Sequence, residues 1–311
     1  MAEVMGVMLR RNPRKVFTIF VTWNLEALWR RIRKLQWPWA PYGQHLKRET
    51  LRDITTKIPK HTDEYLRSTK DIDPYAPEIV ALAVKLGMQE KSKRAYAEAA
   101  YDWVKNNIVF AMERPPGGVV DVLRMRYGLC LNKMAVLVAL MRVAGIPARF
   151  IEYKQTMGSG FMTMIIDEMV SGETGREIIQ EMIEAQPLFT HGCIELYLEG
   201  KWLPMDLTWT DEEEVGLDMP LSQFGESPFG KWYNIIPDSI TRSEDSPLPK
   251  LRLKFGIGIV MLRGLYDKLC HRFDRLREIG QKRLEEMGRE AYIASKKKFY
   301  VPPPQLLSDN Q

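Results

Sequence analysis

The sequence predicts an α+β fold in which a helix that begins with a cysteine packs on an antiparallel sheet. Two observations predict it. An amphipathic helical pattern starts at Cys130, with apolar residues at helical spacing at Met134, Leu137, Val138 and Met141. Residues 191–198 and 201–209 alternate between apolar and polar side chains around Glu199-Gly200, the pattern of a β-hairpin. A helix and a hairpin of this kind favour a mixed architecture.

The helix is expected to place the Cys130 thiol at its N-terminus. The stretch Arg126-Tyr127-Gly128-Leu129 leads into the cysteine through a glycine turn, and Gly145-Ile146-Pro147 ends the helix. One face is expected to pack, which leaves the N-terminus free. Unpaired N–H groups and the helix dipole at that end favour a thiolate, the nucleophilic form of cysteine.

The hairpin provides two partners for the thiol. A two-residue turn pairs Leu198 with Lys201, so His191 is placed opposite Thr208 and Cys193 opposite Asp206. His191 and Asp206 are then diagonal neighbours on one face, within hydrogen-bonding reach. The other face carries an apolar layer that fixes the register, namely Ile194, Leu196, Leu198, Leu203, Met205 and Leu207.

Residues from about 95 to 210 resemble the transglutaminase-like superfamily, in particular the microbial transglutaminase-like cysteine protease type. The resemblance is carried by Arg126-x-Gly128-x-Cys130-x-x-Lys133, by Gly145-Ile146-Pro147-Ala148-Arg149, by the His191 strand and by Gly200-Lys201-Trp202-Leu203-Pro204-Met205-Asp206. It implies a papain/transglutaminase-like core with Cys130 as nucleophile, His191 as general base and acid, and Asp206 as the residue that orients the imidazole.

The activity implied by the resemblance is thiol-dependent acyl transfer at an amide bond of a protein or peptide through a thioester. A water acceptor would make the chain a peptidase or amidase, and a lysine amine would make it a transglutaminase. We expect no cofactor and no metal. Two alternatives remain open: a non-catalytic binding module on the same fold, and a zinc or redox site formed by Cys193 with Cys130, His191 and Asp206.

The chain is divided into three parts. We expect residues 1–70 to form a basic, Trp-rich helical extension, residues 71–240 to form the transglutaminase-like catalytic core, and residues 241–311 to form a linker and a basic amphipathic helix. An insertion at about 155–188 is expected to be either a lid or a surface excursion. The C-terminal helix carries a heptad seam that would pack on the chain's own core or form a dimer, so the oligomeric state is open: Phe255, Ile259, Leu262, Tyr266, Leu269, Phe273 and Leu276.

Charge is distributed unevenly along the chain. Residues 1–60 carry 13 basic and 4 acidic residues, residues 241–311 carry 15 and 9, and the middle has a net charge of −10. Either the basic ends wrap the acidic core, or they bind an anionic partner such as a membrane surface. No nucleic-acid-binding motif accompanies them, so no nucleic acid partner is expected.

Two further expectations concern the cellular location and the segment after the hairpin. Three cysteines and no secretory pattern predict a cytoplasmic protein, with membrane association through the N-terminus as an open alternative.

Residues 210–214 are expected to be an exposed acidic loop that is either simply solvated or attracts a lysine amine. Residues 215–250 are expected to be loop and linker.

Overall fold

The computed structural model describes residues 58, 60–111, 118–157, 188–226, 233–247 and 263–296, together with seven residues between 10 and 25. Most of the Trp-rich extension and of the expected insertion at about 155–188 lie outside the described residues. The same is true of the first three residues of the heptad seam, Phe255, Ile259 and Leu262.

The helical part of the core consists of α3 (Pro77–Lys85), α4 (Lys93–Asn107), α5 (Val119–Met125) and α6 (Cys130–Val143), and α6 begins at the predicted cysteine. The Ser92 hydroxyl caps α4 by accepting a hydrogen bond from the N–H of Ala95 at 3.2 Å. Helix α6 is buried on every side from residue 131 to residue 143, so the expectation of a single packed face was wrong. The helix lies inside the core, where all of its faces are covered.

The sheet is antiparallel and has the order β5-β4-β3-β6, with β7 also paired to β3. Its strands are β3 (Ala148–Met157), β4 (Leu188–Leu198), β5 (Lys201–Met205), β6 (Tyr233–Ile235) and β7 (Thr241–Ser243). The predicted hairpin register is confirmed, because Leu198 pairs with Lys201 and Ile194 pairs with Met205. Two short parallel strands, β1 (Val109–Phe110) and β2 (Tyr127–Gly128), stand apart from this sheet.

The segment expected to be loop and linker is more regular than its composition indicated. It contains β6, a 3-10 turn at Pro237–Ser239 and β7, and both strands pair with β3. The sheet therefore continues past residue 240. Short strands of three residues carry little periodicity, and here the pairing with β3 determines their conformation.

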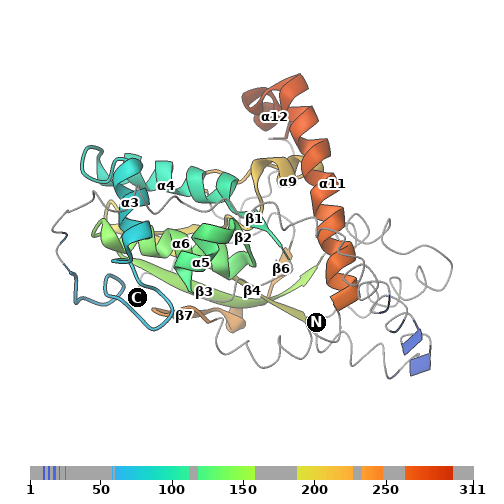
Figure 1. Cartoon of the computed structure of the whole chain (residues 1–311), viewed down its shortest axis with the longest axis horizontal. Coiled ribbons are helices and arrows are strands. Elements are labelled where there is room, and N and C mark those ends of the chain that lie inside the picture. Colours follow the sequence, from blue (N-terminus) through green and yellow to red (C-terminus); the bar gives the residue numbers. More distant parts are fainter. Residues whose placement is uncertain are drawn as a thin grey trace.

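Helix and sheet form two layers. Helices α3 to α6 lie together on one side of the β3–β4 sheet, and α6 packs against both strands (Figure 1). The apolar hairpin face predicted from alternation is buried between them, with Ile194 and Leu196 completely inaccessible to solvent. This mixed arrangement of helices and an antiparallel sheet confirms the predicted α+β class.

The C-terminal part folds back on the core. Helix α11 (Arg263–Met287) packs against the short helix α9 (Asp211–Gly216), and α12 (Arg289–Lys296) follows it (Figure 1). The seam residues Phe273 and Leu276 are buried, so this part of the seam packs within the chain. A Cβ added at Gly216 or Gly280 would clash with the backbone of the other helix, so both glycines are needed for this close approach.

Ion pairs join the basic C-terminal helices to the acidic core. The Arg277 guanidinium lies 3.5 Å from Glu213, and the Arg289 guanidinium donates to Asp211 at 2.6 Å. The basic C-terminal end thus wraps the acidic middle of the chain, one of the two arrangements expected from the charge distribution. Within the described part of the chain, no helix combines the length and the apolarity needed to cross a membrane.

Candidate active site

His191 and Asp206 meet on one face of the β4–β5 hairpin. His191 lies on β4, and Asp206 follows the last residue of β5. Nε2 of the imidazole lies 2.8 Å from Oδ2 of the carboxylate. The Tyr153 ring packs edge-to-face on His191 at 5.6 Å between centroids and limits the movement of the imidazole. The predicted diagonal contact is therefore present.

Cys130 is the first residue of α6, and its side chain is partly exposed. The Asn132 side chain accepts the N–H of Leu129 at 3.1 Å and holds the turn that leads into the helix. The Cys130 side chain also lies near enough to His191 to help raise the pKa of the imidazole. Because Nε2 of His191 faces Asp206, Nδ1 is the ring nitrogen left for the thiol. The structure thus brings all three predicted site residues together.

The charges at this site favour an imidazolium. Burial lowers the pKa of His191, but the charge and hydrogen bond of Asp206 and the contact with Cys130 outweigh burial and raise that pKa to about 10. Burial also raises the pKa of Asp206, yet the His191 charge and hydrogen bonds from His191 and Thr208 lower it overall. A protonated histidine beside an ionised carboxylate is therefore the favoured state at neutral pH.

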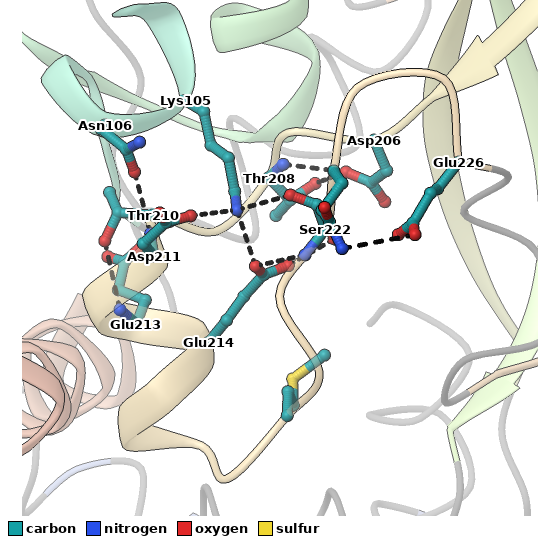
Figure 2. A network of polar contacts seen from close by, with 12 residues as sticks. Lys105, Asn106, Asp206, Thr208, Thr210, Asp211, Glu213, Glu214, Ser222 and Glu226 are labelled. Atoms are coloured by element: carbon teal, nitrogen blue, oxygen red, sulfur yellow. Dashed lines mark hydrogen bonds and ion pairs between the residues drawn. The ribbon is translucent and has the colours of Figure 1, made fainter. Parts of the chain in front are cut away.

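Asp206 is held by further donors. Thr208 donates from its N–H at 2.8 Å and from its hydroxyl at 2.6 Å to Oδ1, the carboxylate oxygen that does not face His191 (Figure 2). The Tyr101 hydroxyl donates to the Asp206 carbonyl oxygen at 3.2 Å. Both carboxylate oxygens are thus fixed by hydrogen bonds, and the direction of Oδ2 toward His191 is set by the turn at residues 206–208.

The acidic run after this turn is a buried helix, so the expectation of an exposed loop was wrong. Asp211 and Glu214 bind the ammonium of Lys105, whose side chain is completely buried (Figure 2). Glu214 also accepts the N–H of Ser222 at 2.7 Å. Because these carboxylates are paired within the chain and shielded from solvent, they are not available to attract a lysine amine.

Cys193 lies on the same hairpin face but is completely buried. Burial, followed by the nearby Asp206 carboxylate, raises the pKa of its thiol well above the ordinary value. The thiol therefore stays protonated and unreactive. Among the described residues, no group of three or more histidine, cysteine or acidic side chains is arranged to hold a metal ion.

The sequence reasoning missed Thr208 and Tyr101. An aspartate that accepts the N–H two residues later forms an Asx turn, so Asp206-Leu207-Thr208 did carry a local signal for Thr208. No local signal pointed to Tyr101, because it lies on α4 and 105 residues separate it from Asp206.

A comparison with known protein families matches the part of the chain that contains the candidate site. Residues 80–207 match the model of the transglutaminase-like superfamily, a span that contains Cys130, His191 and Asp206. No curated protein matched the chain.

Proposed function

We propose, on the premise that residues 80–207 form a transglutaminase-like core, that the chain is a cysteine-dependent enzyme of acyl transfer at amide bonds. The observation that carries the proposal is that one imidazole, His191, binds the Asp206 carboxylate at 2.8 Å and lies near enough to the thiol at the start of α6 to interact with it electrostatically. In this proposal Cys130 is the nucleophile, His191 the general base and acid, and Asp206 the orienting residue.

The first half-reaction transfers the acyl group to sulfur. The Cys130 thiolate attacks the amide carbonyl carbon, and the carbonyl electron pair moves onto oxygen. The N–H of Cys130, one of the unpaired N–H groups that begin a helix, is a donor suited to that oxyanion. The imidazolium of His191 gives its Nδ1 proton to the leaving nitrogen, the C–N bond breaks, and a thioester and a free amine result.

The second half-reaction regenerates the thiolate. Neutral His191 takes a proton from water as the water oxygen attacks the thioester carbon. The C–S bond then breaks, the electron pair returns to the Cys130 sulfur, and the acid is released. Hydrolysis is the proposed outcome because water needs no second binding site, whereas transamidation needs a pocket for the acceptor amine.

The test begins with the thiol. Alkylation of wild-type protein by iodoacetamide is followed at each cysteine by peptide mass spectrometry across pH. Rapid reaction of Cys130 at pH 6, with Cys193 unmodified, is the expected result, because a thiolate paired with imidazolium persists at that pH. If Cys130 reacts at pH 6 no faster than a free cysteine, the non-catalytic binding module replaces this proposal.

The acceptor is identified by a second assay. Peptide amides and casein are incubated with the protein, with and without a labelled primary amine. Release of new amino termini or of ammonia without amine incorporation supports a peptidase or amidase. Incorporation of the label identifies a transglutaminase and contradicts the hydrolytic assignment.

Location and partners follow as proposals of the same kind. We infer a cytoplasmic protein that acts on protein or peptide amides, with a peripheral membrane contact through the basic N-terminal extension. Phe17 and Leu25, two apolar residues described there, are exposed, which supports the contact. Co-flotation with vesicles of anionic lipid at low salt is expected, and its absence contradicts the membrane contact.

A further inference from the structure

Lys133, a second buried cation besides Lys105, lies about one helical turn after Cys130. Lys133 on α6 is completely inaccessible to solvent. Its ammonium donates to the carbonyl oxygen of Lys105 at 3.1 Å and to that of Thr208 at 3.0 Å. Across the described ranges of the chain, no carboxylate lies within ion-pair distance of this ammonium. The side chain is therefore bound to backbone oxygens rather than to a counter-ion.

The two carbonyls belong to separate segments that meet at the candidate active site. Lys105 lies in the last turn of α4, and Thr208 closes the turn that follows Asp206. Lys133 itself stands in the first turn of α6, three residues after Cys130. The Lys133 ammonium thus connects α6, which carries Cys130, to the turn that follows Asp206. Its second hydrogen bond connects α6 to the end of α4.

Thr208 transmits this attachment to Asp206. Its carbonyl oxygen accepts from Lys133, while its N–H and hydroxyl donate to Oδ1 of Asp206, as the Thr208–Asp206 contacts in Figure 2 show. The other carboxylate oxygen, Oδ2, is the one bound to His191. A shift of Thr208 would therefore rotate the carboxylate away from the imidazole.

A charged lysine is costly at this buried position. Burial outweighs the nearby carboxylates, chiefly Glu213, and lowers the pKa of Lys133 to about 8, so the charged form is disfavoured by its surroundings. The two hydrogen bonds to backbone oxygens are what the ammonium provides in return for this desolvation. The buried Lys133 ammonium binds the turn next to Asp206. Its presence is therefore better explained by a role in the active site than by a role in packing the core.

We propose that Lys133 is a positioning residue that holds the Asp206–Thr208 turn in the register required for the His191–Asp206 hydrogen bond. This inference rests on the proposed function of the site. Lys133 touches neither His191 nor the thiol through any contact described above, and it acts through Thr208.

Lys133→Met tests the inference with Arg142→Met as a matched control. Arg142 is also completely buried on α6, and its guanidinium donates to the carbonyl oxygens of Arg67 at 3.0 Å and Ala148 at 2.9 Å. It lies at the opposite end of the helix from Cys130. Both variants lose a buried cation that binds backbone oxygens, but only one of those cations is attached to the Asp206 turn.

The readout is the pH dependence of Cys130 alkylation in the full chain, measured beside urea unfolding. Lys133→Met is expected to lower the alkylation rate of Cys130 at pH 6 about tenfold, because a less well positioned imidazolium stabilises the thiolate less. Arg142→Met is expected to keep the wild-type alkylation profile despite its loss of stability. An unchanged profile in folded Lys133→Met overturns the inference.

Thr208→Val covers the case in which Lys133→Met does not fold. It keeps the shape of the side chain and removes the hydroxyl that binds Asp206, so the same slowing of alkylation is expected. A wild-type profile in Thr208→Val also overturns the inference. Failure of the proposed function is seen separately, because it appears as an ordinary thiol in the wild-type protein before any substitution is made.

Discussion

Nε2 of His191 lies 2.8 Å from Oδ2 of Asp206, although 15 residues separate the two along the chain. The hairpin makes this contact independent of any long loop, because His191 lies on β4 and Asp206 directly follows β5, which is joined to β4 by a two-residue turn. The carboxylate that binds the imidazole is therefore close to the histidine in the sequence. The thiol, by contrast, reaches the histidine only through the packing of α6 on the sheet.

The two cysteines nearest the histidine are expected to differ in function. Cys130→Ala should abolish acyl transfer, because no other nucleophile stands at the start of α6. Cys193→Ala should keep most of the activity, since the Cys193 thiol is buried and protonated. Turnover of a peptide amide by each purified variant checks this, and equal losses in the two would contradict the assignment of the nucleophile.

Asp206→Asn should leave the protein folded and reduce turnover by about three to four orders of magnitude, as orienting carboxylates do in other triads. The amide cannot stabilise the imidazolium by charge, so the pKa of His191 should fall from about 10. Kinetics and a histidine NMR titration measure the two effects. Activity within severalfold of wild type would show that Asp206 does not orient the imidazole.

The stability contributed by the His191–Asp206 pair should depend on pH with a defined sign. The pKa of His191 is raised in the folded state, so its contribution is complete below the ordinary 6.5 and is lost as pH rises through about 10. The pKa of Asp206 is lowered, so its contribution is present above the ordinary 3.8 and is lost as pH falls through the folded value.

Urea unfolding of wild type and Asp206→Asn at several pH values measures this window. The difference in free energy of unfolding is expected to be largest between the ordinary pKa values of the two groups, 3.8 and 6.5. It should decline toward pH 10. A difference that stays constant from pH 5 to pH 10 would mean that the pair is not ionised as described.

Lys105→Met should destabilise the protein by about 3–5 kcal/mol near neutral pH, because it leaves the carboxylates of Asp211 and Glu214 buried with less counter-charge. In the wild type, burial raises the pKa of Asp211 but Lys105 and Arg289 lower it overall, so that contribution is lost only as pH falls through the lowered value. The variant should recover relative stability in acid, since protonation relieves the buried charge.

Unfolding of Lys105→Met at pH 5 and pH 8 is the measurement, with the exposed Lys85→Met on α3 as the control. The control is expected to change stability by less than about 0.5 kcal/mol at both pH values. An equal loss at both pH values in Lys105→Met would contradict the buried ion pairs.

Gly280→Ala should destabilise the chain even though alanine is favoured over glycine in a helix by about 1 kcal/mol. The added Cβ would meet the backbone of Glu212, which cannot move without separating α11 from α9. Thermal unfolding measures the effect. Glu286→Ala, an exposed substitution on the same helix, is the control, and an increase in stability for Gly280→Ala would contradict the close crossing.

The sequence was sufficient for those features that depend on neighbouring residues. The start of α6 followed from the glycine turn before Cys130, and the register followed from alternation around Glu199-Gly200. Each is determined within about ten residues. The assignment of roles to Cys130, His191 and Asp206 stays a prediction, because the structure gives their geometry but not their chemistry.

Features that depend on distant partners were not predictable in this way. Residues 211–214 have the composition of a solvated loop, and they are buried because Lys105, Arg277 and Arg289 arrive from other parts of the chain. The position of Lys133 in the motif was evident, but its two backbone acceptors were not. Neither a charge count nor a periodicity identifies a backbone oxygen as a partner.

The crossing of α9 and α11 has a consequence for the order in which the protein is completed during synthesis. The ribosome releases α9 well before it releases Arg277, Gly280 and Arg289. Until then, Lys105 is the only one of these cations able to neutralise the carboxylates of the nascent helix. The segment next to Asp206 therefore reaches its final packing only after residue 289 has left the exit tunnel, so the growing chain carries its thiol before the surroundings of the carboxylate are finished.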